Sequence, residues 1–168
     1  KKTITVEDGL KVSSNYVFRR LVADNYLDCP DKFIDKLYEY NLHDAYSFDV
    51  TEVAESKPEL PTPDPKMGKY DLVSAAIGYN VKETPLNIVT FYNAIANNGK
   101  MMKPHLIESY EKDGKVIRKV DPEILNGSIC SKATADSLTR ALTMVTLEGT
   151  AATRLKNAKC VVAGKTGT

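Results

Sequence analysis

The six residues from Ala163 to Thr168, AGKTGT, place a lysine and two threonines among small residues. A Gly-Lys-Thr after an apolar run is typical of phosphate-binding loops, which need another glycine five positions before Gly164 and a helix after the motif. Lys159 occupies the glycine position, and no helix follows the motif within the sequence. We therefore do not expect this segment to bind a nucleotide.

The same residues fit a carboxylate-binding strand better. Alternation along a strand places Thr166 and Thr168 on one face, and Gly167 leaves room for a ligand backbone to pass. Two hydroxyls and the cation of Lys165 suit a carboxylate ligand. The apolar stretch from Ala158 favours a β-strand that leads into the Lys-Thr-Gly motif.

A second polar motif, Ser13-Ser14-Asn15, lies roughly 150 residues upstream. A Ser-x-Asn with a Lys-Thr-Gly is a signature of penicillin-binding proteins and serine β-lactamases. Three longer segments strengthen the match: LKVSSN, IGYNVKETPLNIVTFYNAIANNGKMMKP and LEGTAATRLKNAKCVVAGKTGT. The chain resembles the transpeptidase domain of a division-type class B penicillin-binding protein, from its SxN motif to its KTG motif, and the Gly-Thr-Ala favours class B over class A.

This resemblance implies an α+β fold. We expect a mostly helical fragment of the serine β-lactamase/transpeptidase-like fold, with a β-hairpin and the terminal KTG strand. Residues 1–168 are interpreted as a partial transpeptidase domain that lacks the upstream SxxK part and the sheet after KTG. Within it, residues 49–66 form an acidic, proline-rich loop.

The resemblance also implies a function for the parent protein: a peptidoglycan D,D-transpeptidase that cross-links stem peptides through an acyl-serine intermediate and is acylated by β-lactams. Ser13 matches the serine that relays a proton beside Lys165, and Asn15 matches the amide that binds the substrate peptide. Thr166 and Thr168 match the hydroxyls that receive the terminal carboxylate, and the N–H of Thr168 would donate to the oxyanion.

The family's nucleophilic serine lies in an SxxK motif upstream of SxN, and no serine precedes Ser13 here. We assign no nucleophile in this chain and expect it to be inactive alone. Two alternatives stay open for the parent: a non-catalytic β-lactam sensor or cell-wall scaffold, and a D,D-carboxypeptidase.

The composition also bears on whether the chain binds nucleic acid, a metal or a membrane. Lysine and arginine number 23 against 22 acidic residues, which argues against nucleic acid, because duplex-binding proteins usually carry a basic excess. Three scattered cysteines without a CxxC pair and two isolated histidines, His43 and His105, predict no metal site, and we expect no cofactor. No apolar run reaches the ~20 residues of a membrane span, so any anchor is expected outside this soluble segment.

For the parent, the resemblance implies a location at the periplasmic face of the bacterial inner membrane. Its expected partners are peptidoglycan stem peptides, β-lactam antibiotics and cell-wall synthesis proteins.

The elements that must position the motifs can also be predicted. Helices are expected on both sides of Ser13-Ser14-Asn15. Tyr16 and Phe18 depart from the small residues usual after SxN in the family, so we expect a repacked neighbour there. Asp31 is predicted to cap the next helix, in which Phe33, Ile34 and Leu37 form an apolar stripe.

Three further elements carry local signals. Thr84 and Pro85 start a helix that Gly99 ends. Asp113-Gly114 predicts a type I′ hairpin turn. A long helix is predicted from Ser131 to about Thr146, with an apolar face of Ala135, Leu138, Leu142 and Val145.

Overall fold

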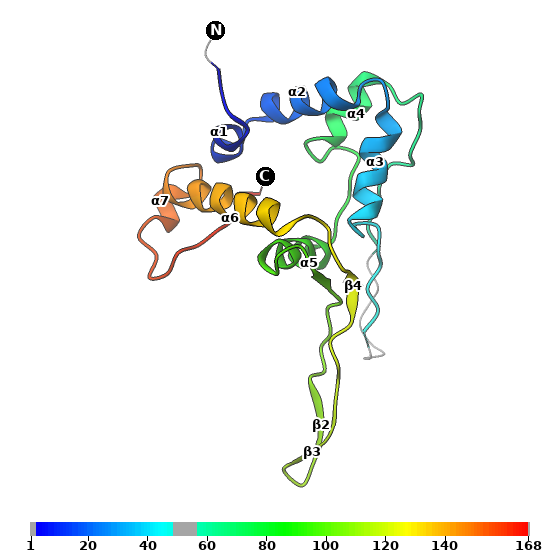
Figure 1. Cartoon of the computed structure of the whole chain (residues 1–168), viewed down its shortest axis with the longest axis vertical. Helices are drawn as coiled ribbons and strands as arrows, with labels where there is room; N and C mark the ends of the chain where they lie inside the picture. Colours follow the sequence, from blue (N-terminus) through cyan, green and yellow to red (C-terminus); the bar gives the residue numbers. More distant parts are fainter. Residues whose placement is uncertain (1–2, 49–56, 168) are drawn as a thin grey trace.

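The computed structural model describes residues 3–48 and 57–167. Seven helices and four short strands follow one another in this part of the chain (Figure 1). The helices are α1 (Val6–Lys11), α2 (Asn15–Tyr26), α3 (Pro30–Glu39), α4 (Lys69–Ala75), α5 (Pro85–Ala96), α6 (Lys132–Leu147) and α7 (Ala152–Leu155). None of the helices in these two ranges combines the length and the apolar character needed to cross a bilayer.

The strands form two small antiparallel sheets. β1 (Met101–Met102) pairs with β4 (Ile124–Asn126), and β2 (Ser109–Lys112) pairs with β3 (Lys115–Lys119). Between β2 and β3, Asp113 and Gly114 have φ angles of 53° and 74°. Two successive positive φ angles define a type I′ turn, so the hairpin prediction is confirmed. Figure 1 shows this hairpin extending away from the helices; we call residues 106–120 the arm.

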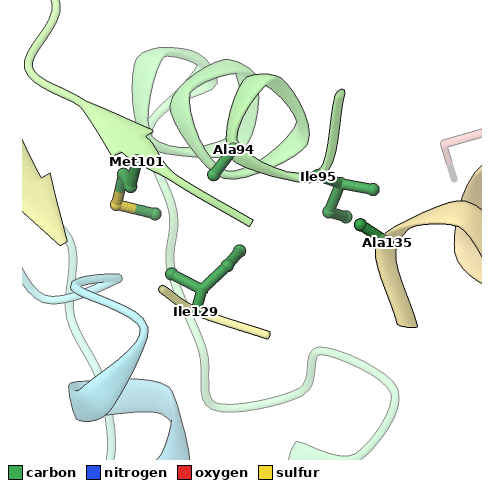
Figure 2. Close-up of a cluster of buried hydrophobic side chains, with 5 residues drawn as sticks. All are labelled: Ala94, Ile95, Met101, Ile129 and Ala135. Carbon is green, nitrogen blue, oxygen red and sulfur yellow. The ribbon is translucent and has the colours of Figure 1, made fainter. Parts of the chain in front are cut away.

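The main hydrophobic core lies where α5, β1 and the start of α6 meet (Figure 2). Its centre consists of Ala94, Ile95, Met101, Ile129 and Ala135, all 9% exposed or less. Gly99, between α5 and β1, makes this packing possible, because it has a φ of 90° and a Cβ there would lie 2.2 Å from the carbonyl oxygen of Cys130.

Two helices begin where the sequence predicts, and a hydroxyl caps each of them. The Thr84 hydroxyl accepts a hydrogen bond from the backbone N–H of Asn87 at 3.1 Å, and the Ser131 hydroxyl accepts one from Thr134 at 3.1 Å. Asn87 is 2% exposed, and its side-chain amide donates to the carbonyl of Asp44 at 2.9 Å. This hydrogen bond joins α5 to the segment after α3.

The predicted cap at Asp31 is wrong by two residues. Cys29 is the N-cap of α3, Pro30 is its first residue, and Asp31 lies in the first turn. Proline fits the first helical position because its fixed φ suits a helix and the N–H that it lacks would have had no intrahelical partner. Ile34 of the predicted apolar stripe is fully buried.

The predicted terminal KTG strand is also wrong. Residues 158–167 form no strand in the described chain and run beside α6 instead. The hydroxyl of buried Thr146 donates to the carbonyl of Val162, and the N–H of Gly164 donates to the carbonyl of Leu142 at 3.3 Å. A strand requires a neighbouring strand for its backbone hydrogen bonds, and here the neighbour is a helix.

Of the proline-rich segment, residues 49–56 lie outside the described residues. Residues 57–66 contain no helix. Glu59 and Lys82 form an isolated antiparallel bridge, and their side chains make an ion pair at 2.7 Å. The carbonyl of Pro61 accepts a hydrogen bond from the Tyr38 hydroxyl at 3.4 Å, which holds this segment against α3.

Candidate active site

The Ser-Ser-Asn motif lies at the junction of α1 and α2. Ser14 is the N-cap of α2, and its hydroxyl accepts a hydrogen bond from the N–H of Val17 at 3.4 Å. Ser13 has a φ of 54°, a left-handed conformation that is uncommon for serine and recurs at functional sites. Because Ser14 provides the cap, the hydroxyl of Ser13 is available for contacts elsewhere.

The structure brings Ser13 and Lys165 together although they are 152 positions apart. The ammonium of Lys165 donates a hydrogen bond to the Ser13 hydroxyl oxygen. The same Nζ lies 3.1 Å from the hydroxyl oxygen of Thr166, and the Ser13 and Thr166 hydroxyl oxygens are 3.5 Å apart. Two hydroxyls and one cation therefore share a single site.

The other residues predicted for the site are placed less tightly. Asn15 is the first residue of α2 and is exposed, and its side chain makes no hydrogen bond within residues 3–48 and 57–167. Gly167 is exposed, and a Cβ added there would meet no atom within 4 Å. Within the described residues, the Asn15 side chain is therefore held by no hydrogen bond, and the space beside Gly167 is open. Thr168 lies outside the described residues.

A contact between α1 and the end of α6 positions the site. The N–H of Thr150 donates to the carbonyl of Lys11, the last residue of α1, at 3.2 Å. A Cβ on Gly149 would lie 2.3 Å from the same carbonyl oxygen, so only glycine permits this approach. The ammonium of Lys11 also pairs with Glu148 at 3.5 Å. These contacts hold the end of α1, and hence Ser13, against the segment that leads to Lys165.

Thr150 is a site residue that sequence reasoning missed. Its hydroxyl oxygen lies 3.0 Å from that of Thr166, so Thr150 contacts both walls of the site through its backbone and side chain. The Gly149-Thr150-Ala151 triplet was the available signal, but by itself it indicated only a class of penicillin-binding protein. Its role in the site depends on its position between Lys11 and Thr166, which the sequence does not show.

Burial at the site lowers the pKa of Lys165, because desolvation penalises its charged form. A lowered pKa raises the fraction of neutral amine that can accept a proton at a given pH. With the Ser13 hydroxyl as neighbour, the pair can pass a proton to or from a reacting group. The Thr166 hydroxyl beside them can donate a hydrogen bond to a carboxylate.

The structure also shows where an SxxK-spaced pair and the possible metal-binding side chains lie. Ser109 and Lys112 have SxxK spacing, but both lie on β2 of the arm, which projects away from α1 (Figure 1). In residues 3–48 and 57–167, no group of three or more His, Cys, Asp or Glu side chains could hold a metal ion.

Comparisons with known proteins identify the family. Residues 1–168 match the family model of the penicillin binding protein transpeptidase domain. Penicillin-binding protein 2A of Bacillus subtilis (strain 168) is 33% identical over 103 residues, which cover 58% of this chain and 14% of that protein.

Solved structures show the same fold. The D,D-transpeptidase domain of peptidoglycan glycosyltransferase from Eggerthella lenta superposes with a TM-score of 0.79 at 24% identity, covering 98% of this chain and 41% of that one. Penicillin-binding protein 2B from Streptococcus pneumoniae (strain R6) gives a TM-score of 0.79 at 22% identity, covering 98% and 30%. The chain spans less than half the length of each of these relatives. It belongs to the penicillin binding protein transpeptidase domain family.

Proposed function

We propose that this chain is part of a peptidoglycan D,D-transpeptidase of class B, division type, which cross-links stem peptides through an acyl-serine intermediate. The observation that carries the proposal is the hydrogen bond from the Lys165 ammonium to the Ser13 hydroxyl. It joins the SxN and KTG motifs in one site, as a proton relay between a nucleophile and a leaving amine requires.

The chemistry is an acyl transfer in two steps. A serine of an SxxK segment outside these residues attacks the carbonyl between two D-alanines, and the C–N bond of that peptide breaks. The proton of the attacking serine passes through Ser13 and Lys165 to the departing amine of the terminal D-alanine. An amine of a neighbouring stem peptide then takes the acyl group, and its proton returns through the same pair to the serine, which is freed.

The remaining site residues bind the substrate in this proposal. Asn15 binds the peptide chain, and the hydroxyls of Thr166 and Thr168 hold the terminal carboxylate. Gly167 carries no side chain, which allows the substrate backbone to pass, and no contact in the described chain explains a glycine there. The N–H of Thr168 donates to the oxyanion. Thr150 acts through Thr166 and is a positioning residue.

Residues 1–168 would then be a partial domain of a longer protein, completed by the SxxK segment and by the sheet after KTG. The lengths of the relatives support this, since the chain covers 14% of the Bacillus subtilis protein and 41% of the Eggerthella lenta structure. We place the parent at the periplasmic face of the inner membrane, with cell-wall synthesis proteins as partners and β-lactams as inhibitors.

Labelling with fluorescent penicillin tests the proposal. The 168-residue chain should remain unlabelled, whereas a longer polypeptide that includes the SxxK segment should be acylated. In that polypeptide Lys165→Ala should slow acylation about 100-fold, the typical contribution of a positioned acid or base. Lys159→Ala removes a nearby exposed lysine and should leave the rate within about twofold.

The products separate the alternatives. Cross-linked stem-peptide dimers are expected from a transpeptidase, whereas a carboxypeptidase releases only shortened monomers. Acylation without turnover of any stem peptide would contradict the proposal and favour a β-lactam sensor. Unchanged acylation of the Lys165→Ala variant would remove Lys165 from the mechanism.

A further inference from the structure

A cleft opens between α2 and α4, directly beyond the SxN motif. It has a volume of about 390 Å³, and its walls include Tyr16, Arg19 and Arg20 from α2 and Lys69 from α4. Tyr16 follows Asn15 in the chain, so the cleft begins one residue from a proposed substrate-binding side chain. Its volume is in the usual range for a small-ligand site.

The cleft contains more cationic than anionic side chains. Arg20 is already neutralised by Asp24, since their side chains form an ion pair at 2.7 Å. Arg19 and Lys69 form no ion pair within residues 3–48 and 57–167. One guanidinium and one ammonium therefore face the cleft without a carboxylate partner.

Arg19 carries a further sign of a missing partner. Its Nε is buried and has no hydrogen-bond acceptor in the described part of the chain. A buried donor without a partner costs free energy, and most such groups in folded proteins are hydrogen-bonded. The guanidinium to which this Nε belongs lies in the wall of the cleft, so the charge of an anionic ligand there would offset part of this cost. A carboxylate suits this position, because an arginine can bind both of its oxygens at once.

Tyr16 is one of the two aromatic residues that replace the small residues usual after SxN in the family. The aromatic residues after SxN suggested a repacked neighbour, but the Tyr16 side chain is 71% exposed and forms part of the cleft wall. Its ring requires no rearrangement of the core. An exposed ring beside unpaired cations offers an apolar surface for the carbon skeleton of a ligand whose charge the cations hold.

We propose that this cleft binds a stem-peptide carboxylate of uncross-linked peptidoglycan, one distinct from the terminal carboxylate at the cleavage site. Arg19 and Lys69 bind the carboxylate, and Tyr16 packs against the adjoining part of the stem. The proposal rests on the proposed function, because peptidoglycan reaches the cleft only if Asn15 holds the peptide chain. The cleft then fixes the direction in which the stem enters the active site.

Binding of two matched probes tests this proposal on the full-length protein that carries this chain. One probe is a muramyl pentapeptide with a free side-chain carboxylate, and the other has that carboxylate amidated. Arg19→Gln should weaken binding of the free-carboxylate probe about tenfold, as expected for loss of a charge-assisted hydrogen bond, and leave the amidated probe within about twofold. Lys69→Gln, on the exposed surface of α4, should act in the same direction without risk to the core.

Arg118→Gln is the control, since it removes an exposed guanidinium from the arm. It should leave the affinity of both probes unchanged. The proposal is overturned if Arg19→Gln and Lys69→Gln bind the free-carboxylate probe like the wild type, or if both probes lose affinity equally.

Penicillin labelling separates this proposal from the proposed function. Penicillin has no stem-peptide side chain, so Arg19→Gln and Lys69→Gln should be acylated at the wild-type rate. If the wild-type protein is not acylated, the proposed function fails, whereas the difference between the two probes still reports on the cleft.

Discussion

At the scale of single residues, Glu83 is an unusual side chain outside the candidate active site and the α2–α4 cleft. Both of its carboxylate oxygens are buried and have no hydrogen-bond partner among residues 3–48 and 57–167. Burial raises the pKa of Glu83 to about 7, because the charged form is poorly solvated there. The residue directly precedes Thr84, the cap of α5, so its ionisation affects the start of a core helix.

Glu83 makes stability depend on pH in a defined direction. The protonated acid is favoured in the folded chain, so this contribution is fully present below the ordinary pKa of glutamate. It is lost as the pH rises through about 7. The wild-type chain should therefore lose about 2 kcal/mol between roughly pH 5 and pH 8, allowing for partial exposure of the side chain.

Urea denaturation followed by circular dichroism measures this effect. Glu83→Gln cannot ionise and should remove most of the pH dependence, whereas Glu111→Gln, on the exposed arm, should keep it. Equal slopes for the wild type and Glu83→Gln would show that Glu83 ionises freely in the folded chain.

At the scale of elements, the contact between α1 and α6 matters most for the site. α1 has six residues, too few to be stable alone, so its position depends on packing. The carbonyl at its end lies against Gly149 and receives the N–H of Thr150. The orientation of Ser13 toward Lys165 therefore depends on a backbone contact between two helix ends.

Gly149→Ala tests this dependence. The added methyl group would lie 2.3 Å from a backbone oxygen, which cannot move aside as a side chain could. We expect a loss of about 2–3 kcal/mol, typical of overpacking, and a shift of α1 away from α6. Gly127→Ala is the matched control, since a Cβ there would meet no atom within 4 Å.

Two measurements follow this change. Denaturation midpoints give the stability, and amide chemical shifts of Ser13 and Thr166 report on the site. Gly127→Ala should leave both the denaturation midpoint and these chemical shifts nearly unchanged. If Gly149→Ala also left the shifts of Ser13 and Thr166 unchanged, the α1–α6 contact would not be what positions the site.

At the scale of the whole molecule, the chain divides into a helical body and the projecting arm (Figure 1). The core cluster involves α5, β1 and α6, whereas every residue of β3 is exposed. The N–H of Val120 donates to the carbonyl of Glu108 at 2.9 Å, so the two ends of the hairpin lie side by side. The arm can therefore contribute little to the stability of the body.

Removing the arm is expected to leave the body folded. Replacing Ser109–Lys119 by Asn-Gly joins two residues that are already hydrogen-bonded and should change the free energy of unfolding by less than about 0.5 kcal/mol. Met101→Ala is the contrasting variant, since it truncates a side chain that is 1% exposed and should cost about 3 kcal/mol. A shortened chain that no longer unfolds cooperatively would show that the arm belongs to the core.

The sequence by itself determined the features that depend on neighbouring residues. Thr84 and Ser131 cap their helices, and Asp113-Gly114 forms its turn, because these interactions involve atoms a few residues apart. The prediction at Asp31 failed at the same local scale, since Pro30 takes the first helical position. The motifs also identified the family, because they follow one another along the chain in the family's order.

Only the tertiary structure decided what depends on distant segments. The apolar stretch from Ala158 predicts a β-strand, but Val162 and Gly164 form their hydrogen bonds with residues of α6. The tertiary structure also decided that Ser13 meets Lys165 and that Thr150 touches Thr166. Such contacts join segments far apart in the chain, and packing of the whole molecule brings them together.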